Sequence, residues 1–94
     1  MNKVFIIVEV PLIEEQYEVY IPIGKKIHKV AQILAKAVSE LSGGHYPIKD
    51  NPMLYSKMTG KPYNINMTVK DTDIRNGTEI IYESSRNYGS FRSV

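Results

Sequence analysis

The sequence predicts an α+β fold in which one helix packs on a mixed sheet of four to five strands. Two apolar runs with strand-like alternation open the chain, and a long run with helical spacing follows them. Further along, a turn that finishes at Asn76-Gly77 leads into a final apolar strand around Ile80. In chain order these elements are strand, strand, helix, strand, strand. A chain of 94 residues can build only one core, so we expect a single domain.

The first strand is predicted at residues 3–10, KVFIIVEV, which are rich in β-branched and aromatic side chains. Alternate residues of a strand face opposite sides of the sheet, so one set is expected to point into the core. That inward set is Val4, Ile6, Val8 and Val10, whereas Phe5, Ile7 and Glu9 are expected to point outward. A proline follows, and residues 11–16 are expected to form a connection of hairpin length.

The second strand is predicted at residues 17–23, where apolar and polar side chains alternate more cleanly. Its inward positions are Tyr17, Val19, Ile21 and Ile23. Glu18 and Tyr20 are expected to face outward, and Pro22 and Gly24 mark the end of the strand.

The helix is predicted from Ile27 to Leu41, because its apolar residues recur every three or four positions. The apolar face consists of Ile27, Val30, Ala31, Leu34, Ala37, Val38 and Leu41. Gly43-Gly44 are suited to the left-handed backbone that ends a helix. Residues 45–52 contain two prolines, so they are expected to form a loop that carries the chain back across the sheet.

The second half of the chain contains shorter elements. A third strand is predicted at residues 53–58, with a turn at 59–62 and a few further residues of strand at 64–67. Residues 71–77 have turn chemistry throughout. The last strand is predicted at residues 79–83, with Ile80 and Tyr82 pointing inward.

The predicted domain covers residues 1–83, and residues 84–94 are expected to form a flexible tail because they are rich in serine and lack periodicity. Cysteine is absent, which excludes disulfides, thiolate metal sites and a cysteine nucleophile. The sequence shows no signal peptide and nothing near the roughly 20 apolar residues of a membrane span. We therefore expect a cytoplasmic protein that does not insert into a membrane.

The net charge of +2 gives no indication of nucleic-acid binding. Basic and acidic residues balance at 10 each over residues 1–83, and the excess lies at Arg86 and Arg92. A nucleic-acid interface would gather positive charge into a patch with aromatic residues between. The one basic cluster, Lys25-Lys26 and Lys29, precedes or opens the helix and is better explained as a solvated surface.

No catalytic, cofactor or metal site is expected. The two histidines, His28 and His45, lie at opposite ends of the helix, roughly 24 Å apart at 1.5 Å per residue. Asp71 and Asp73 resemble half of a calcium loop, but Tyr82 stands where its closing glutamate is required. The sequence therefore predicts a protein that is not an enzyme and that carries no metal or cofactor.

Large side chains are expected on the outward face of the sheet, where scattered exposure does not account for them. They are Phe5, Ile7, Tyr20, Tyr55 and Ile81. We interpret these five residues as a candidate protein-binding surface. The alternative is that residues 45–52, or the tail through Tyr88 and Phe91, cover them.

Three segments resemble the ubiquitin-like (β-grasp) superfamily, and most closely the YukD/EsaB type of bacterial proteins that accompany type VII (WXG100) secretion systems. They are the strand-to-helix passage Tyr17 to Val38, the turn Met58-Thr59-Gly60-Lys61, and the closing pattern Val69, Ile74, Asn76-Gly77, Ile80, Tyr82. Together they lie within residues 3–83, and the tail beyond them departs from the pattern.

This resemblance implies a non-catalytic accessory or regulatory component of a secretion system, whose partner is a cytosolic domain of a larger membrane component. Docking would use the outward face of the sheet, or β-augmentation at the edge strand of residues 17–23. The alternative is a ubiquitin-like protein modifier or sulfur carrier. Such proteins need a C-terminal glycine, whereas this chain ends in Ser93-Val94 and would have to be cut after Gly89. A third alternative, a phage or plasmid-borne ubiquitin-like protein of unrelated role, also stays open.

Overall fold

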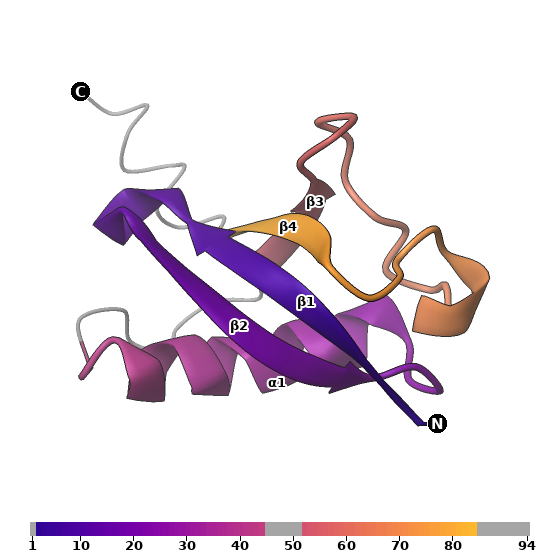
Figure 1. Cartoon of the computed structure of the whole chain (residues 1–94), viewed down its shortest axis with the longest axis horizontal. Coiled ribbons are helices and arrows are strands. Elements are labelled where there is room, and N and C mark those ends of the chain that lie inside the picture. The colour runs from indigo at the N-terminus through magenta and orange to yellow at the C-terminus, as the bar shows by residue number, and fades with distance from the viewer. Residues whose placement is uncertain (1, 45–51, 85–94) are drawn as a thin grey trace.

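The computed structural model describes residues 2–44 and 52–84, in which one helix lies across one face of a four-stranded sheet (Figure 1). The strands are β1 (Lys3–Val10), β2 (Glu15–Pro22), β3 (Pro52–Ser56) and β4 (Thr78–Ser84), and the helix is α1 (Ile27–Leu41). Two short 3-10 turns, η1 (Pro11–Ile13) and η2 (Val69–Asp71), precede β2 and β4. The predicted loop at 45–52, except Pro52, and the predicted tail beyond Ser84 lie outside the described residues.

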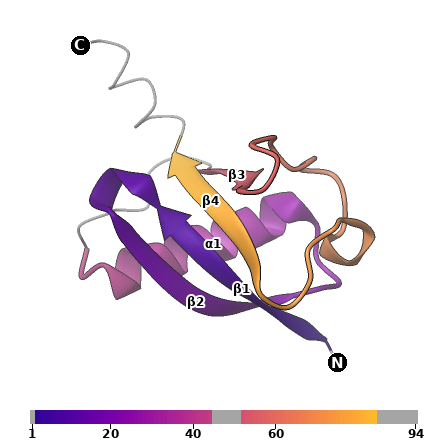
Figure 2. The same cartoon turned by 45° about the horizontal axis from the view of Figure 1, so that its top comes forward.

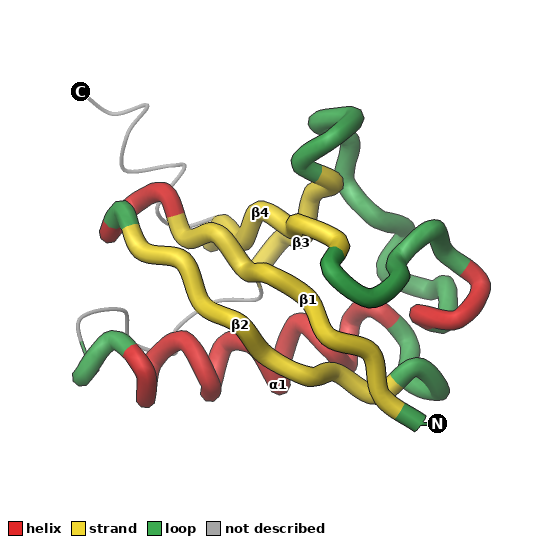
Figure 3. The backbone as a smooth tube through the Cα atoms, in the orientation of Figure 1, coloured by secondary structure: helices red, strands yellow, loops and turns green. Residues whose placement is uncertain are grey.

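The strand order in the sheet is β2-β1-β4-β3 (Figures 2 and 3). The two central strands, β1 and β4, are parallel, and each edge strand runs antiparallel to its neighbour. The sheet is therefore mixed, as the sequence predicts.

The prediction of additional strand at residues 64–67 is wrong, so the described residues form four strands instead of five. The backbone there serves the start of α1. The amide of Ile27 donates to the carbonyl of Met67 at 2.8 Å, and the amide of His28 donates to the carbonyl of Ile65 at 3.1 Å. These bonds satisfy two of the amides that have no partner within the helix itself.

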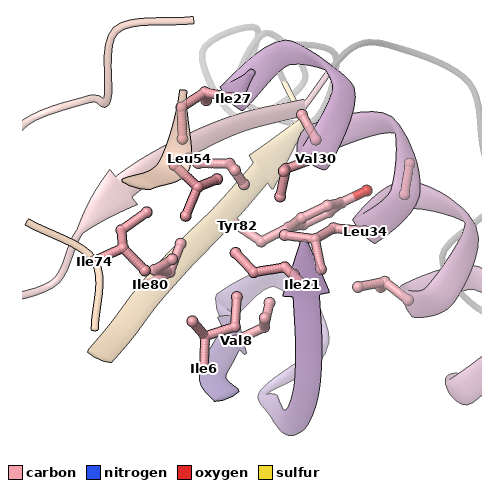
Figure 4. Packing of buried hydrophobic residues seen from close by; sticks show 14 of the residues in the cluster. Ile6, Val8, Ile21, Ile27, Val30, Leu34, Leu54, Ile74, Ile80 and Tyr82 are labelled. Carbon is pink, nitrogen blue, oxygen red and sulfur yellow. The ribbon is translucent and has the colours of Figure 1, made fainter. Parts of the chain in front are cut away.

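The core lies between α1 and the inward face of the sheet (Figure 4). The predicted inward residues of β1 are all buried, as are Ile80 and Tyr82 of β4, so the predicted facing of both strands is confirmed. Leu54 of β3 and Ile74, which precedes β4, complete the side of the core under the N-terminal half of α1.

The helix begins and ends at the predicted residues, but its buried face differs at three positions. Ala35 is buried, whereas Ala37 is only partly buried and Leu41 is 55% exposed. The buried stripe of α1 is Ile27, Val30, Ala31, Leu34, Ala35 and Val38. Leu41 lies in the last turn, beyond this stripe.

The two glycines after α1 end it as predicted. Gly43 and Gly44 have φ values of 68° and 87°. The Gly44 amide donates to the carbonyl of Ser39 at 2.9 Å, and the Gly43 amide donates to that of Glu40 at 3.2 Å. This pair of bonds is the Schellman motif, which satisfies carbonyls at the end of a helix.

The start of β2 and the end of β3 differ from the predictions by two residues because the turns beside them are tight, and the other ends of β2, β3 and β4 differ by one residue. The β1-β2 connection closes at Glu14, which has a φ of 53° and donates its amide to the carbonyl of Pro11 at 3.0 Å, so β2 begins two residues early. After β3, the Gly60 amide donates to the carbonyl of Ser56 at 2.7 Å, so the strand ends there and not at Met58.

Candidate protein-binding surface

The five predicted surface residues occupy the face of the sheet that points away from α1, which we call the outer face. Cross-strand pairing brings them into two groups. Phe5 on β1 pairs with Tyr20 on β2, and Ile81 on β4 pairs with Tyr55 on β3. Ile7 lies between them on β1, two residues from Phe5. The sheet therefore brings all five residues onto one surface.

The aromatic pair at one end of the outer face has a defined geometry. The ring centroids of Phe5 and Tyr20 are 5.7 Å apart, with an edge-to-face angle of 63°, which is a favourable arrangement for two aromatic rings. Tyr20 is 64% exposed. The two rings form a mainly apolar hollow of about 640 Å³, lined also by Asn2, Lys3 and Asn76. A side chain from a partner could fit this hollow.

The backbone of Phe5 is fixed by the turn before β4. The amide of Phe5 donates to Asn76 Oδ1 at 2.9 Å, and its carbonyl accepts the amide of Gly77 at 2.8 Å. Gly77 has a φ of 88°, which a side chain would strain. The Asn76-Gly77 turn therefore holds the aromatic end of the outer face in place.

The other four predicted residues, Phe5, Ile7, Tyr55 and Ile81, are partly buried by their neighbours in the sheet. In Figures 1 and 2, α1 lies on the opposite face of the sheet. Within residues 2–44 and 52–84, no other helix or strand packs over the outer face. The described part of the chain thus leaves these side chains in contact with solvent.

Four glutamates surround the apolar residues of the outer face, and the sequence predicts the outward position of two of them, Glu9 and Glu18. In the strand register, Ile7 lies between Glu18 and Glu79, and Ile81 lies beside Glu9. Glu83 follows Ile81 on the same face. Strand alternation predicts Glu9 and Glu18 on this face, and the same alternation along β4 assigns Glu79 and Glu83 to it.

One cation partly balances these carboxylates. Lys57 Nζ lies 3.3 Å from Glu9 Oε2, in an ion pair whose side chains are 43% and 32% exposed. Solvent screens an exposed pair, so it contributes little to stability. The outer face is consequently an apolar surface with an acidic border.

Tyr63 lies outside the outer face, next to β3, and has a buried polar group. Its hydroxyl is buried and has no hydrogen-bond partner among the described residues. Burial raises the pKa of Tyr63 above its ordinary value of 10.0; the nearby Ser56 hydroxyl lowers it by a smaller amount, and the Asp73 carboxylate raises it further. A hollow of about 510 Å³ adjoins it.

Metal-binding clusters and membrane-spanning helices are both absent from the part of the chain that the structure describes. No group of three or more histidine, aspartate or glutamate residues among them is arranged to hold a metal ion. None of the helices in residues 2–44 and 52–84 has the length and apolar character needed to cross a membrane.

The chain resembles known proteins in structure and not in sequence. No protein-family model matches it, and no curated protein sequence matches it. The EccD5 ubiquitin-like domain from Mycobacterium xenopi superposes with a TM-score of 0.72 at 14% identity, covering 89% of this chain and 96% of that one. The ubiquitin-like domain of the Mycobacterium tuberculosis type VII secretion system protein ECCD1 gives 0.71 at 10% identity, covering 89% and 100%.

The fold is ubiquitin-like. A chain of the MycP5-free ESX-5 inner membrane complex, with a TM-score of 0.74 at 15% identity, contains the same arrangement. The match covers 99% of this chain but only 27% of that longer chain. At these identities the likeness establishes the ubiquitin-like β-grasp fold of the described sheet and helix. The outer face defined above is thus one face of a ubiquitin-like sheet.

Proposed function

We propose that this chain is a non-catalytic ubiquitin-like interaction module, of the YukD/EsaB type, that acts in the cytosol as an accessory or regulatory component of a type VII-like secretion system. Its partner would be a cytosolic domain of a larger membrane component. Docking would use the outer face, with Phe5, Ile7, Tyr20, Tyr55 and Ile81 as the contact residues.

The observation that carries this proposal is the apolar cluster of the outer face. Large apolar and aromatic side chains surrounded by charged ones are typical of surfaces that bind proteins. Tyr20, with 64% of its surface exposed, and the hollow beside it provide a position for an anchoring side chain. The glutamates around the cluster favour a partner surface with a basic border.

The link to secretion rests on two kinds of likeness. The sequence segments of residues 17–38, 58–61 and 69–82 resemble YukD/EsaB proteins. The structure is similar to the ubiquitin-like domains of EccD5 and ECCD1, and the latter is described as a type VII secretion system protein. A further similar chain belongs to an inner membrane complex. These similarities favour a membrane secretion component as the partner.

Affinity capture from the native host tests this proposal. The full-length chain would carry an N-terminal tag, and mass spectrometry would identify both the bound proteins and the C-terminus of the chain itself. We expect a membrane ATPase or another secretion subunit to be recovered with a chain that still ends at Val94. A chain shortened to Gly89 and covalently attached to other proteins would contradict the proposal and favour the modifier alternative.

A further inference from the structure

The sequence contains a single asparagine that is followed by glycine, at Asn76-Gly77. Asparagine is a thermolabile residue. It loses its side-chain amide when the backbone nitrogen of the next residue attacks Cγ, and a glycine at that position has no Cβ to obstruct the attack. Both residues are exposed in the turn before β4. Asn76 is therefore the asparagine of this chain at which spontaneous deamidation is chemically most favoured.

The reaction has two steps, and water is its only co-reactant. In the first step the Gly77 nitrogen loses its proton and forms a bond to Asn76 Cγ, while the bond from Cγ to Nδ2 breaks and the amino group takes up a proton and leaves as ammonia. The product is a cyclic imide. In the second step water adds to one of the two imide carbonyls and opens the ring, which leaves either aspartate or isoaspartate. Both products carry a carboxylate in place of a neutral amide.

Two hydrogen bonds to Phe5 hold both reacting groups in the folded chain. Asn76 Oδ1 accepts the Phe5 amide at 2.9 Å, and the Gly77 amide donates to the Phe5 carbonyl at 2.8 Å. The first bond fixes the side chain that would be attacked, and the second occupies the N–H group that must be deprotonated. An amide in such a bond releases its proton to solvent when the bond opens. The fold therefore restrains the reaction that the sequence favours.

Two further bonds close the turn around the reactive pair. The Thr78 amide donates to the Arg75 carbonyl at 3.0 Å, and the Arg75 amide donates to Thr78 Oγ1 at 2.8 Å. With a φ of 88°, Gly77 has the backbone that a β-turn of type II requires at its third residue. These bonds restrict the backbone on both sides of the reactive pair, so we expect cyclisation to become faster when either is lost.

We propose that Asn76 is a site of spontaneous deamidation, and that the bonds to Phe5 limit the reaction to local openings of the turn. The site does not depend on the docking proposed above, because the reaction needs only water. Asn76 lines the mainly apolar hollow beside Phe5 and Tyr20, so either product places a negative charge there. Aspartate keeps an oxygen that accepts the Phe5 amide. Isoaspartate adds a methylene group to the backbone before Gly77, which disrupts the spacing of the two bonds to Phe5.

Mass spectrometry of proteolytic fragments, with aspartate and isoaspartate resolved, measures the deamidation rate at Asn76. The full-length chain is incubated at mildly alkaline pH beside the same chain in enough urea to unfold it and a capped synthetic peptide of residues 74–79. We expect Asn76 in the folded chain to react at least about tenfold more slowly than in the peptide, and urea to raise the rate to that of the peptide. Equal rates in the folded chain and the peptide, or no reaction at Asn76 in the unfolded chain, would overturn the proposal.

Two threonine variants distinguish local opening of the turn from unfolding of the whole chain. Thr78→Val removes the acceptor of the Arg75 amide, and it should accelerate deamidation of the folded chain about fivefold, which is the effect of one hydrogen bond on an opening equilibrium. Thr59→Val is the matched control, because Thr59 Oγ1 accepts the Lys61 amide at 3.2 Å in a different turn. This control should leave the rate at Asn76 within about twofold of the wild type. Equal acceleration by both variants, or none by Thr78→Val, would contradict local opening.

Discussion

Gly77 links the turn before β4 to the backbone of Phe5. Its φ of 88° lies in a region that costs other residues about 1–2 kcal/mol. We expect Gly77→Ala to lower the free energy of unfolding by about that amount, as measured by urea denaturation. Gly24→Ala is the matched control, because Gly24 does not have a positive φ and has nothing within 4 Å of an added Cβ. A similar loss in both variants would contradict the account of Gly77.

The raised pKa of Tyr63 predicts that the free energy of unfolding decreases at alkaline pH. Its pKa in the folded chain is raised above 10.0, chiefly by burial, so the unfolded chain ionises first. With respect to this group, the free energy of unfolding is at its full value below pH 10.0, and it falls as the pH rises from there through the folded-state pKa. We expect urea unfolding to show this loss in the wild type.

Tyr63→Phe is the matching variant. It should reduce the decrease in stability above pH 10.0, and at neutral pH it should be neutral or slightly stabilising because it removes a buried hydroxyl without a partner among the described residues. An identical alkaline decrease in the variant would show that other groups cause it.

Some single-residue features could not be predicted from the sequence. Glu14 closes the connection between β1 and β2 with a positive φ, a conformation that glutamate seldom adopts. Asn76-Gly77, by contrast, was predictable as a turn, because glycine is the residue best suited to positive φ. The hydrogen bonds between this turn and Phe5 depend on the three-dimensional arrangement, because Asn76 lies 71 residues from Phe5 in the sequence.

At the scale of elements, α1 contains one leucine in the core and another at the surface. Leu34 is 1% exposed in the centre of the core, whereas Leu41 is 55% exposed. We expect Leu34→Ala to lower the free energy of unfolding by about 2–5 kcal/mol through lost burial and the cavity that remains. Leu41→Ala should change it by less than about 0.5 kcal/mol. Thermal and urea unfolding measure both, and equal losses would contradict the burial of the helix described here.

The helix and strands with regular spacing were predictable, because burial of one side imposes the period on the sequence. α1 was predicted to the residue, and the inward sets of β1 and β4 were correct. The predictions are wrong at positions whose structure depends on tertiary contacts and not on the local pattern. Residues 64–67 alternate like a strand, but their carbonyls accept bonds from the start of α1, and Leu41 has helical spacing but extends beyond the buried stripe.

At the scale of the whole molecule, the sequence predicted which large side chains share the outer face but not which charged residues lie beside each of them. Strand alternation assigns Ile7 and Ile81 to one side. The order β2-β1-β4-β3 then determines that Ile7 lies between Glu18 and Glu79, which no local pattern reveals. The acidic border, and with it the expectation of a basic partner, therefore depends on the register of the assembled sheet.

This border affects how the outer face should be mutated. Aspartate at Ile7 or Ile81 would lie beside glutamates, and each such like-charge pair destabilises a sheet by roughly 0.2–1 kcal/mol. Lysine at these positions would lie beside the same carboxylates and form favourable cross-strand pairs. The two double variants, Ile7→Asp with Ile81→Asp and Ile7→Lys with Ile81→Lys, consequently disrupt the apolar surface with opposite electrostatic effects on the sheet.

Quantitative capture of the proposed membrane secretion partner by these variants is the most direct test of the proposed outer-face docking. Met58→Asp with Ile65→Asp is the control, since it changes two exposed apolar residues elsewhere and adds the same charge as the aspartate variant. Circular dichroism would establish that each variant is folded. We predict that both outer-face variants lose at least about tenfold of the captured partner while the control retains it. Capture at the wild-type level by folded outer-face variants would contradict the account.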